Sequence, residues 1–327
     1  MYESFYELKE KPFSLTPDPK FIYWSNIHRE ALASLLYAVR ERRGFMVLTG
    51  EVGTGKTTLI RKLLGSLGDD TVTAFIFNPP RTVGELFAYM FEELGLSLNG
   101  KTKGEAVIQL SRFLIDRILK GQNTLLVIDE AQNLGPKMLE EIRLLSNLET
   151  SQEKLIQIIL VGQPELASML KLPELRQLNQ RVSVRYHLKS LTREETQEYV
   201  KQRLKIAGAI HNGIFDRAAL EAIYRFSKGV PRLVNVICDH ALVSGYASDQ
   251  RRVTAALVKE AFNAINGQEE SGRFRLAAGL SGVRFRQGVL VFLLALATLV
   301  AILGSLNLEA VWAEKLKQAL GRLATKI

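Results

Sequence analysis

The sequence predicts an α/β fold, with a parallel β-sheet of five strands followed by a small all-helical domain. Two observations carry this prediction. Up to residue 190, short apolar runs alternate with longer amphipathic helical patterns, which is typical of a parallel sheet covered by helices on both faces. After Leu188, only helical patterns can be recognised.

Each predicted strand is an apolar run with the composition of a strand buried on both faces. These runs are Phe45–Thr49, Val72–Phe77, Thr124–Asp129, Ile156–Gly162 and, more weakly, Val182–Leu188. Helical patterns precede or separate them at Glu30–Arg42, Lys56–Leu67, Val83–Leu94, Glu105–Leu119 and Lys137–Leu148. We therefore expect an extended lead-in and a first helix over residues 1–44, and an α/β domain over 45–190.

The helical domain is predicted over residues 191–266. Its helices are expected at Arg193–Ala207, Arg217–Ser227, Arg232–Ser248 and Ala255–Asn266. Thr192, Asp216 and Thr254 stand where N-caps belong, because their side-chain oxygens can accept from the first free backbone N–H groups of a helix.

The C-terminal part of the sequence changes character twice. Residues 267–287 are polar, with four arginines, and are interpreted as a basic linker. Residues 288–308 carry no charge, and about 20 apolar residues suffice to cross a bilayer. A buried helix is the alternative, but the absence of charge on every face favours a membrane helix. Residues 309–327 form a short amphipathic tail whose role the sequence leaves open.

The amino-acid composition indicates a folded protein and limits the compartments and partners to be considered. Hydrophobic residues make up 47% and charged residues 24%, as in an ordinary folded chain. The single cysteine, Cys238, excludes an internal disulfide and fits a reducing compartment. A net charge of +9 suits nucleic acid or an anionic membrane surface, and equally a mildly basic cytosolic face. No apolar signal segment opens the chain.

The most informative motif lies between the first strand and the helix after it. The run Gly50-Glu51-Val52-Gly53-Thr54-Gly55-Lys56-Thr57-Thr58 fits the phosphate-binding P-loop, G-x-x-x-x-G-K-[ST]. Glycines let the backbone curl so that its N–H groups face a phosphate chain, at the positive end of a helix. Lys56 is expected to reach the β- and γ-phosphates of ATP, and Thr57 to hold Mg²⁺.

Two carboxylates end the third predicted strand. Asp129 is expected to lie near the Mg²⁺, and Glu130 to polarise the attacking water as a general base. Acidic residues at strand ends are often only solvated, but downstream of a P-loop this pair favours hydrolysis over nucleotide binding alone.

Four further polar residues are candidates. Gln163 ends the strand expected beside the P-loop strand and could align water or sense the γ-phosphate. Arg181, or alternatively Arg176, precedes the fifth strand and could reach the ATP of a neighbouring subunit. Arg232 begins a helix of the helical domain and could couple domain closure to the nucleotide. Surface charge is the competing interpretation for the arginines, and an ordinary polar strand end for Gln163.

Together these features resemble an AAA+ ATPase, a P-loop NTPase core with a helical lid. More narrowly, the chain resembles the ExeA/GspA family of secretion-associated ATPases and its pilus-biogenesis relative MshM. The resemblance covers roughly Met1 to Ala264. Its motifs are Pro12–Pro19, His28–Leu32, Asp129–Leu134, Leu160–Leu166 and Gly229–Arg232.

The resemblance implies the strand order 5-1-4-3-2. It implies that Gln163 is the first sensor, Arg232 the second sensor and Arg181 the arginine finger, which requires a homo-oligomer. It also implies that the lead-in around Phe21–His28 covers the adenine.

ExeA-like proteins often carry a periplasmic peptidoglycan-binding domain after their membrane span. Residues 309–327 are too few for a domain, so direct binding to peptidoglycan is not expected. Charges on the two sides of the span are nearly balanced. Because an ATPase needs cytosolic ATP, we expect Met1–Gln287 in the cytoplasm and the span in the inner membrane.

The sequence therefore predicts a membrane-anchored ATPase that uses ATP and Mg²⁺ to support assembly of an envelope machine, such as a secretion, pilus or exopolysaccharide system. Two alternatives stay open. One is a DNA-linked transposition helper of the TniB or IstB kind, which shares the core and would suit the basic charge. The other is a nucleotide-gated scaffold with little turnover.

Overall fold

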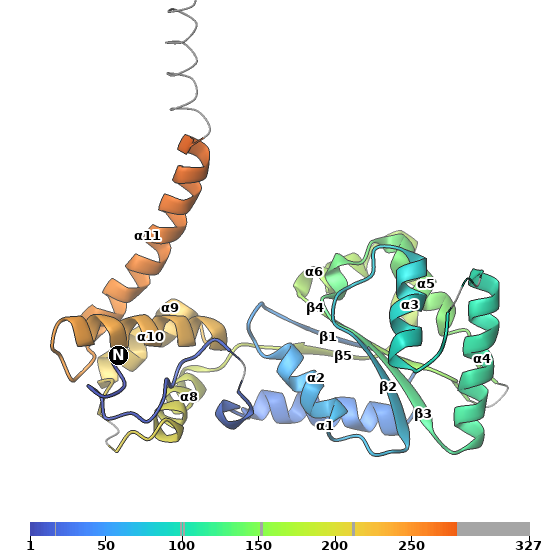
Figure 1. The fold of residues 1–327 in the computed structure, drawn as a ribbon, viewed down its shortest axis with the longest axis horizontal. Coiled ribbons are helices and arrows are strands. Elements are labelled where there is room, and N and C mark those ends of the chain that lie inside the picture. Colours follow the sequence, from blue (N-terminus) through green and yellow to red (C-terminus); the bar gives the residue numbers. More distant parts are fainter. Residues whose placement is uncertain (17, 99, 101, 151–152, 211–212, 280–327) are drawn as a thin grey trace, which may run out of the picture. The chain divides into compact units, whose positions relative to one another are not determined.

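The computed structural model describes residues 1–279 except 17, 99, 101, 151–152 and 211–212 (Figure 1). Residues 1–262 form one compact unit and residues 263–327 a second. The predicted membrane helix at 288–308 and the tail at 309–327 lie outside the described residues. Within the described part of the chain, no helix is long and apolar enough to cross a bilayer.

The centre of the first unit is a parallel sheet in the order β2-β3-β4-β1-β5. This is the predicted order read from the other edge, so the prediction is confirmed. The strands are β1 (Phe45–Gly50), β2 (Thr71–Ile76), β3 (Asn123–Ile128), β4 (Gln157–Gly162) and β5 (Val182–Leu188). Strands β1, β3 and β4 are buried at every residue, which explains why they are mostly apolar.

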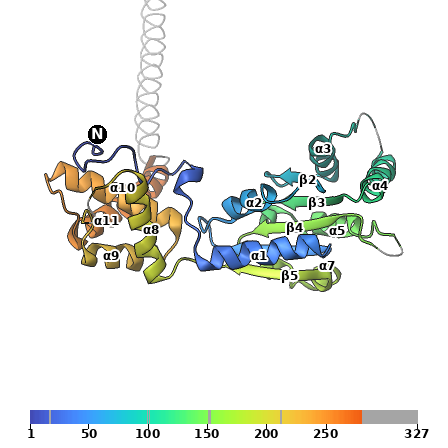
Figure 2. The same cartoon turned by 90° about the horizontal axis from the view of Figure 1, so that it is seen from below.

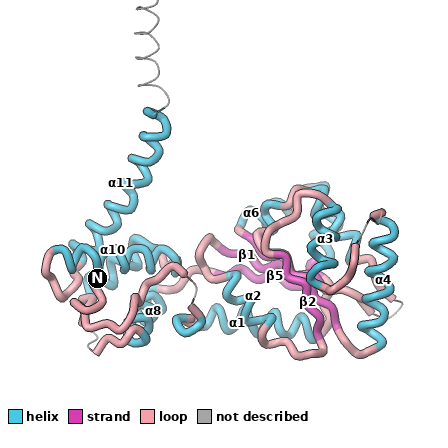
Figure 3. The backbone as a smooth tube through the Cα atoms, in the orientation of Figure 1, coloured by secondary structure: helices cyan, strands magenta, loops and turns pink. Residues whose placement is uncertain are grey.

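Helices cover both faces of the sheet (Figures 1 and 3). On one face, α1 (Asn26–Arg40) and α2 (Lys56–Leu64) share a buried cluster that includes Leu35, Leu48 and Leu59. The other face is covered by α3 (Val83–Glu93), α4 (Lys103–Leu119) and α5 (Pro136–Leu145). The short helices α6 (Pro164–Met169) and α7 (Arg176–Arg181) and three single 3₁₀ turns, Pro19–Phe21, Ala131–Asn133 and Pro173–Leu175, were not predicted.

The chain leaves β5 and enters a helical lid, so the carboxyl ends of the parallel strands face the lid (Figure 2). The lid consists of α8 (Arg193–Ile206), α9 (Arg217–Ser227), α10 (Pro231–Ala247) and the start of α11 (Ala255–Gly279). Two of the expected N-caps are confirmed. The side chain of Thr192 accepts from Glu195 N within a capping box, and that of Asp216 accepts from Ala219 N.

Several helix boundaries differ from the sequence prediction: α2 and α5 each end three residues early, at Leu64 and Leu145, and the largest differences are in α1 and α11. Helix α1 begins at Asn26, four residues before the expected Glu30, because the Ser25 side chain caps it. Helix α11 continues to Gly279, although residues 267–279 were interpreted as part of a linker. That stretch contains no proline, and its Glu, Arg, Ala and Leu residues are good helix formers, although Gly267, Gly272 and Gly279 are not.

The lead-in before α1 packs on the lid as an irregular segment (Figure 3). Tyr6 Oη donates to the carbonyl of Gln250, and the backbone N–H of Lys9 donates to the carbonyl of Ala207. Phe13, only 1% exposed, meets Phe215 edge to face at 6.1 Å between ring centroids. Because these contacts bury backbone and aromatic surface together, the start of the lead-in, from Tyr6 to Phe13, belongs structurally to the lid although it comes first in the chain.

Gly229 offers a test of how the lid joins the core. Its φ is +75°, its carbonyl accepts from Leu191 N at 3.0 Å, and a Cβ there would overlap the Leu191 carbonyl. Gly229→Ala should lower the free energy of unfolding by about 2–5 kcal/mol, because backbone strain and overlap add. Urea titration followed by circular dichroism measures this.

Gly121→Ala is the matched control for that substitution. Gly121 has nearly the same φ, +74°, but a Cβ there would meet nothing within 4 Å. It should cost only about 1–2 kcal/mol, the price of the left-handed conformation. Equal losses for the two variants would contradict the packing seen at Leu191.

Candidate nucleotide site

The loop after β1 has the curled backbone of a P-loop. Gly53 and Gly55 have φ values of +80° and +97°, which a side chain would strain. The turn is closed by Thr54, whose Oγ1 donates to the carbonyl of Glu51 at 2.8 Å. Helix α2 begins immediately at Lys56, so the positive end of the helix faces the loop.

Lys56 lies inside this loop. Its side chain is 6% exposed, and Nζ donates to the carbonyls of Gly50 and Glu51 at 2.8 and 3.0 Å. Burial lowers the pKa of Lys56, and the nearby Glu130 and Asp129 carboxylates oppose that shift. A buried ammonium with only carbonyl partners is well suited to take up a phosphate oxygen, whose charge compensates its desolvation.

Thr57 and Asp129 meet across the edge of the sheet. Thr57 Oγ1 donates to Asp129 Oδ2 at 2.7 Å, and Asp129 Oδ1 accepts from Glu130 N at 2.9 Å. Asp129 is fully buried. No set of three or more His, Cys, Asp or Glu side chains among the described residues could hold a metal alone. One hydroxyl and one carboxylate fit Mg²⁺, which keeps several waters and takes further oxygens from substrate phosphates.

Glu130 adopts a left-handed backbone conformation, with φ +51° and ψ +34°. Such strain in a residue other than glycine is often found at functional sites. Its Oε2 accepts from Gln132 Nε2 at 2.5 Å and from Gln163 Nε2 at 3.3 Å. Gln132 Oε1 also accepts from the backbone N–H of Gln163 at 3.0 Å, so the three residues form a closed network of hydrogen bonds.

Gln163 lies where the sequence predicted it. It follows β4, whose Gly162 pairs with Thr49 at the end of β1, directly beside the P-loop. Its partner Gln132 was not recognised from the sequence. A polar residue two positions after Glu130 was the available signal, but only the turn Ala131–Asn133 folds it back onto the Glu130 carboxylate.

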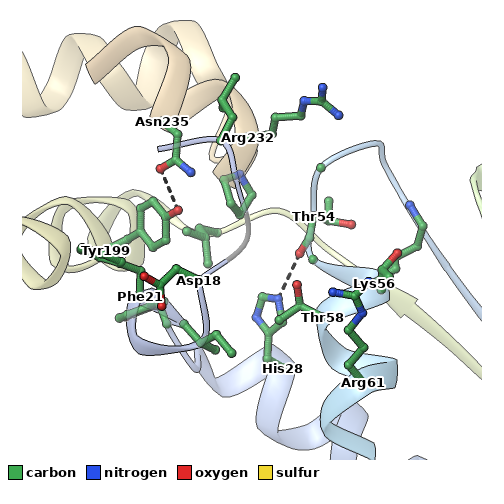
Figure 4. A pocket seen from close by; sticks show the side chains of 18 of the residues that line it. Asp18, Phe21, His28, Thr54, Lys56, Thr58, Arg61, Tyr199, Arg232 and Asn235 are labelled. Atoms are coloured by element: carbon green, nitrogen blue, oxygen red, sulfur yellow. Dashed lines mark hydrogen bonds between the residues drawn. The ribbon is translucent and has the colours of Figure 1, made fainter. Parts of the chain in front are cut away.

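The lid reaches the P-loop through Arg232. Its backbone N–H donates to the carbonyl of Gly53 at 3.3 Å, and a Cβ on Gly53 would stand 2.5 Å from Arg232 Cβ. Arg232, Lys56, Thr58 and Arg61 line a common cavity of about 650 Å³ (Figure 4). The structure therefore brings Arg232, a residue of the lid, to the cavity beside the P-loop.

The lead-in and the lid form the opposite wall of this cavity, through Phe21, Ile22, Tyr23, Trp24, Tyr199, Arg203 and Asn235. Tyr199 Oη donates to Asn235 Oδ1 at 2.8 Å (Figure 4). Arg203 is 7% exposed, and its guanidinium lies 4.7 Å from the Phe21 ring centroid and donates to Tyr199 Oη. This wall contains aromatic and apolar side chains with a few polar groups, the composition expected around a nucleobase.

The Tyr199–Arg203–Asn235 group was missed in the sequence. Helical spacing placed these residues on helices, but no motif marks them, and their grouping arises from the packing of α8 against α10. Burial raises the pKa of Tyr199, so the phenol stays protonated and remains a hydrogen-bond donor.

Arg181 and Arg176 are not brought to this site. Arg181 precedes Val182, which pairs with Phe45 at the amino end of β1, whereas the P-loop follows the carboxyl end. Arg181 Nη1 donates to Ser146 Oγ at 2.8 Å. Both arginines are exposed and lie at or before the amino edge of β5. Neither arginine therefore lies at the nucleotide site of its own chain.

Comparison with known proteins agrees with this geometry. A protein-family model described as an AAA domain matches residues 39–170, which contain the P-loop, Asp129, Glu130 and Gln163. General secretion pathway protein A of Aeromonas hydrophila is 41% identical over 285 residues. The match covers 86% of this chain and 52% of that protein, so the chain spans about half the length of this relative.

These findings support an ATPase. Among solved structures, the ORC2 protein of Aeropyrum pernix in its ADPNP–ADP complexes has a TM-score of 0.56 at 18% identity, over 78% of this chain and 71% of that one. CDC6P of Pyrobaculum aerophilum has the same TM-score at 21% identity, over 74% and 67%. At such identities the likeness concerns the fold alone, and it agrees with an AAA-type core and a five-stranded parallel sheet.

Proposed function

We propose that this protein is an ATPase of the AAA+ kind that hydrolyses ATP with Mg²⁺ and is anchored in the inner membrane, where it supports assembly of an envelope machine of the type II secretion kind. The convergence of Lys56, the Thr57–Asp129 pair and the Glu130 network at one edge of the sheet carries the proposal of hydrolysis.

The phosphates of ATP would lie along the P-loop backbone, with Lys56 Nζ exchanging its carbonyl partners for β- and γ-phosphate oxygens. Thr57 and Asp129 would hold Mg²⁺, which when bound supplies charge neutralisation to the transferring phosphoryl group. Glu130 would accept the proton of the attacking water, and Gln163 would orient that water. Because Glu130 and Gln163 already share a hydrogen bond, both can address one water molecule.

Arg232 is proposed as the sensor that links the lid to the γ-phosphate. Two observations support this role: its backbone N–H donates to the carbonyl of Gly53, and Arg232 lines the cavity beside the P-loop. The lead-in around Phe21–His28 is proposed to cover the base, as its position in the cavity wall supports.

The similar secretion protein supports a role in a secretion system. General secretion pathway protein A carries secretion in its name and matches 86% of this chain, which favours a secretion role over the DNA-linked alternative. Anchoring rests on the uncharged segment at 288–308, which would leave Met1–Gln287 in the cytoplasm with ATP. Direct binding to peptidoglycan is not part of the proposal.

The substitution Glu130→Gln tests hydrolysis directly. It keeps the size of the side chain and removes the base, so turnover should fall by about 10²-fold or more while ATP affinity stays within about threefold. Steady-state phosphate release and titration with a fluorescent ATP analogue measure the two quantities.

Glu140→Gln is a suitable control, because Glu140 lies on α5 and pairs with Arg143 away from the cavity. Its turnover should match wild type. If Glu130→Gln hydrolysed ATP at the wild-type rate, Glu130 would not be the base and the proposed site would be wrong.

Arg181→Ala tests action between subunits. Since Arg181 cannot reach its own P-loop, the variant should bind ATP normally and lose at least about 10³-fold in turnover, the usual contribution of an arginine finger. Arg176→Ala shows which of the two arginines acts on the neighbouring subunit.

Mixing Arg181→Ala with Glu130→Gln should restore part of the activity, because at some mixed interfaces one subunit keeps Glu130 and its neighbour keeps Arg181. A fully active monomer would exclude action between subunits.

Membrane anchoring predicts how the intact chain partitions. Full-length protein should sediment with membranes, resist extraction by alkaline carbonate and dissolve in detergent, because an inserted helix is held by its apolar surface. A variant ending at Gln287 is the control and should stay in the supernatant. Full-length protein that is freely soluble without detergent would refute the anchor.

A further inference from the structure

His28 is the last residue of the Phe21–His28 lead-in, and its ring contacts the P-loop backbone, a contact that the scheme above does not use. It occupies the first turn of α1 and is 7% exposed. Its Nε2 is 3.0 Å from the carbonyl oxygen of Thr54, and its Nδ1 is 2.7 Å from Ser25 Oγ (Figure 4). The same Ser25 Oγ accepts from the backbone N–H of His28 as the N-cap of α1.

The chemistry of these partners determines the state of the ring. A carbonyl oxygen can only accept, so Nε2 must carry the proton. A neutral imidazole then has a lone pair on Nδ1, which takes the hydroxyl proton of Ser25. Burial lowers the pKa of His28, which agrees with a neutral ring. Every polar atom of the Ser25–His28–Thr54 chain is therefore satisfied in one orientation.

This orientation has a consequence for the loop. The peptide unit that contains the Thr54 carbonyl also contains the Gly55 N–H, and in a planar trans peptide the two point in opposite directions. Holding the carbonyl toward His28 therefore aims the Gly55 N–H the other way. Gly55 has φ +97°, and a Cβ there would stand 3.1 Å from His28 Nε2, so the ring also packs closely against this turn.

The support behind the ring is rigid. Helix α1 buries Ala31, Leu35 and Ala38 completely against the sheet, so the position of His28 is set by the core. The side chain joins this helix to a loop that contains two glycines with positive φ and would otherwise have more backbone freedom.

We propose that His28 is a positioning residue of the nucleotide site, which holds the Thr54–Gly55 peptide so that the Gly55 N–H points at the phosphates of ATP. This inference rests on the proposed nucleotide binding but requires neither hydrolysis nor a partner protein. It predicts that the affinity for ATP depends on the hydrogen bond from His28 to the Thr54 carbonyl, and not merely on the bulk of the ring.

Two substitutions separate the halves of the interaction. In His28→Gln, the amide nitrogen stands at the same distance along the side chain as Nε2 and can still donate to Thr54. In His28→Asn, the amide is one carbon shorter and corresponds to Nδ1, so it can reach Ser25 but leaves the Thr54 carbonyl unpaired. His240→Asn, at an exposed position of α10, is the control.

The readouts are the affinity for a fluorescent ATP analogue with Mg²⁺ and, in nucleotide-free protein, the amide hydrogen exchange of the peptide covering residues 50–58. His28→Asn should weaken affinity about tenfold, as the loss of a buried hydrogen bond implies, and accelerate exchange severalfold. His28→Gln should stay within about threefold of wild type in both, and His240→Asn should equal wild type.

Equal behaviour of His28→Asn and wild type, or equal losses in both His28 variants, would overturn the proposal. If His28→Asn does not fold, Ser25→Ala replaces it, because this variant removes the hydrogen bond that orients the ring. Its affinity for the ATP analogue should fall two- to fivefold, and hydrogen exchange of residues 50–58 should be faster. A Ser25→Ala variant with unchanged affinity or unchanged exchange would contradict the proposal. Exchange is measured without ATP, so a wild-type protein that showed no hydrolysis would defeat the proposed function while leaving this test intact.

Discussion

The parallel pairing of β1 with β4, and of β4 with β3, is the constraint on which the rest of the structure depends. Parallel strands end at the same edge of a sheet, so the P-loop after Gly50, the acids after Ile128 and Gln163 after Gly162 must converge. All three strands are completely buried. A slip of one residue would turn every side chain to the other face, so the core fixes the register and with it the site.

At that edge of the sheet, two charged side chains are buried and held by polar partners within the protein itself. Lys56 is buried against carbonyl groups, and Asp129 is buried against a hydroxyl and a backbone N–H. These partners provide hydrogen bonds to each charged group but no opposite charge. A site of this kind suits a ligand with both signs of charge, as a nucleotide with its magnesium ion has, because each buried charge then gains a compensating partner.

The lead-in gives the lid and the core a shared element. Residues near Tyr6, Lys9 and Phe13 pack on the lid, whereas His28, at the start of the next helix, bonds to the P-loop. The lid also touches the loop directly through Arg232 and Gly53. Movement of the lid would therefore act on the phosphate-binding backbone from two sides, through one covalent segment and one packed contact.

The sequence by itself determined the local chemistry: five strands, the P-loop at Gly50–Thr57, the Asp129–Glu130 pair, the caps at Thr192 and Asp216, and even the strand order, which followed from a family resemblance. It did not show that β2 and β5 are only partly buried, because burial at the two edges of the sheet depends on which helices cover them. These features depend on spacing along the chain, which periodicity and motif report. Only the tertiary structure decided that Gln132 folds onto Glu130, that Tyr199, Arg203 and Asn235 line the cavity, that His28 holds Thr54, and that Arg181 stands at the wrong edge for its own ATP. Those contacts depend on the turn after β3 and on the packing of segments far apart in the sequence, so they exist only once the core has set the helices and the sheet edge in place.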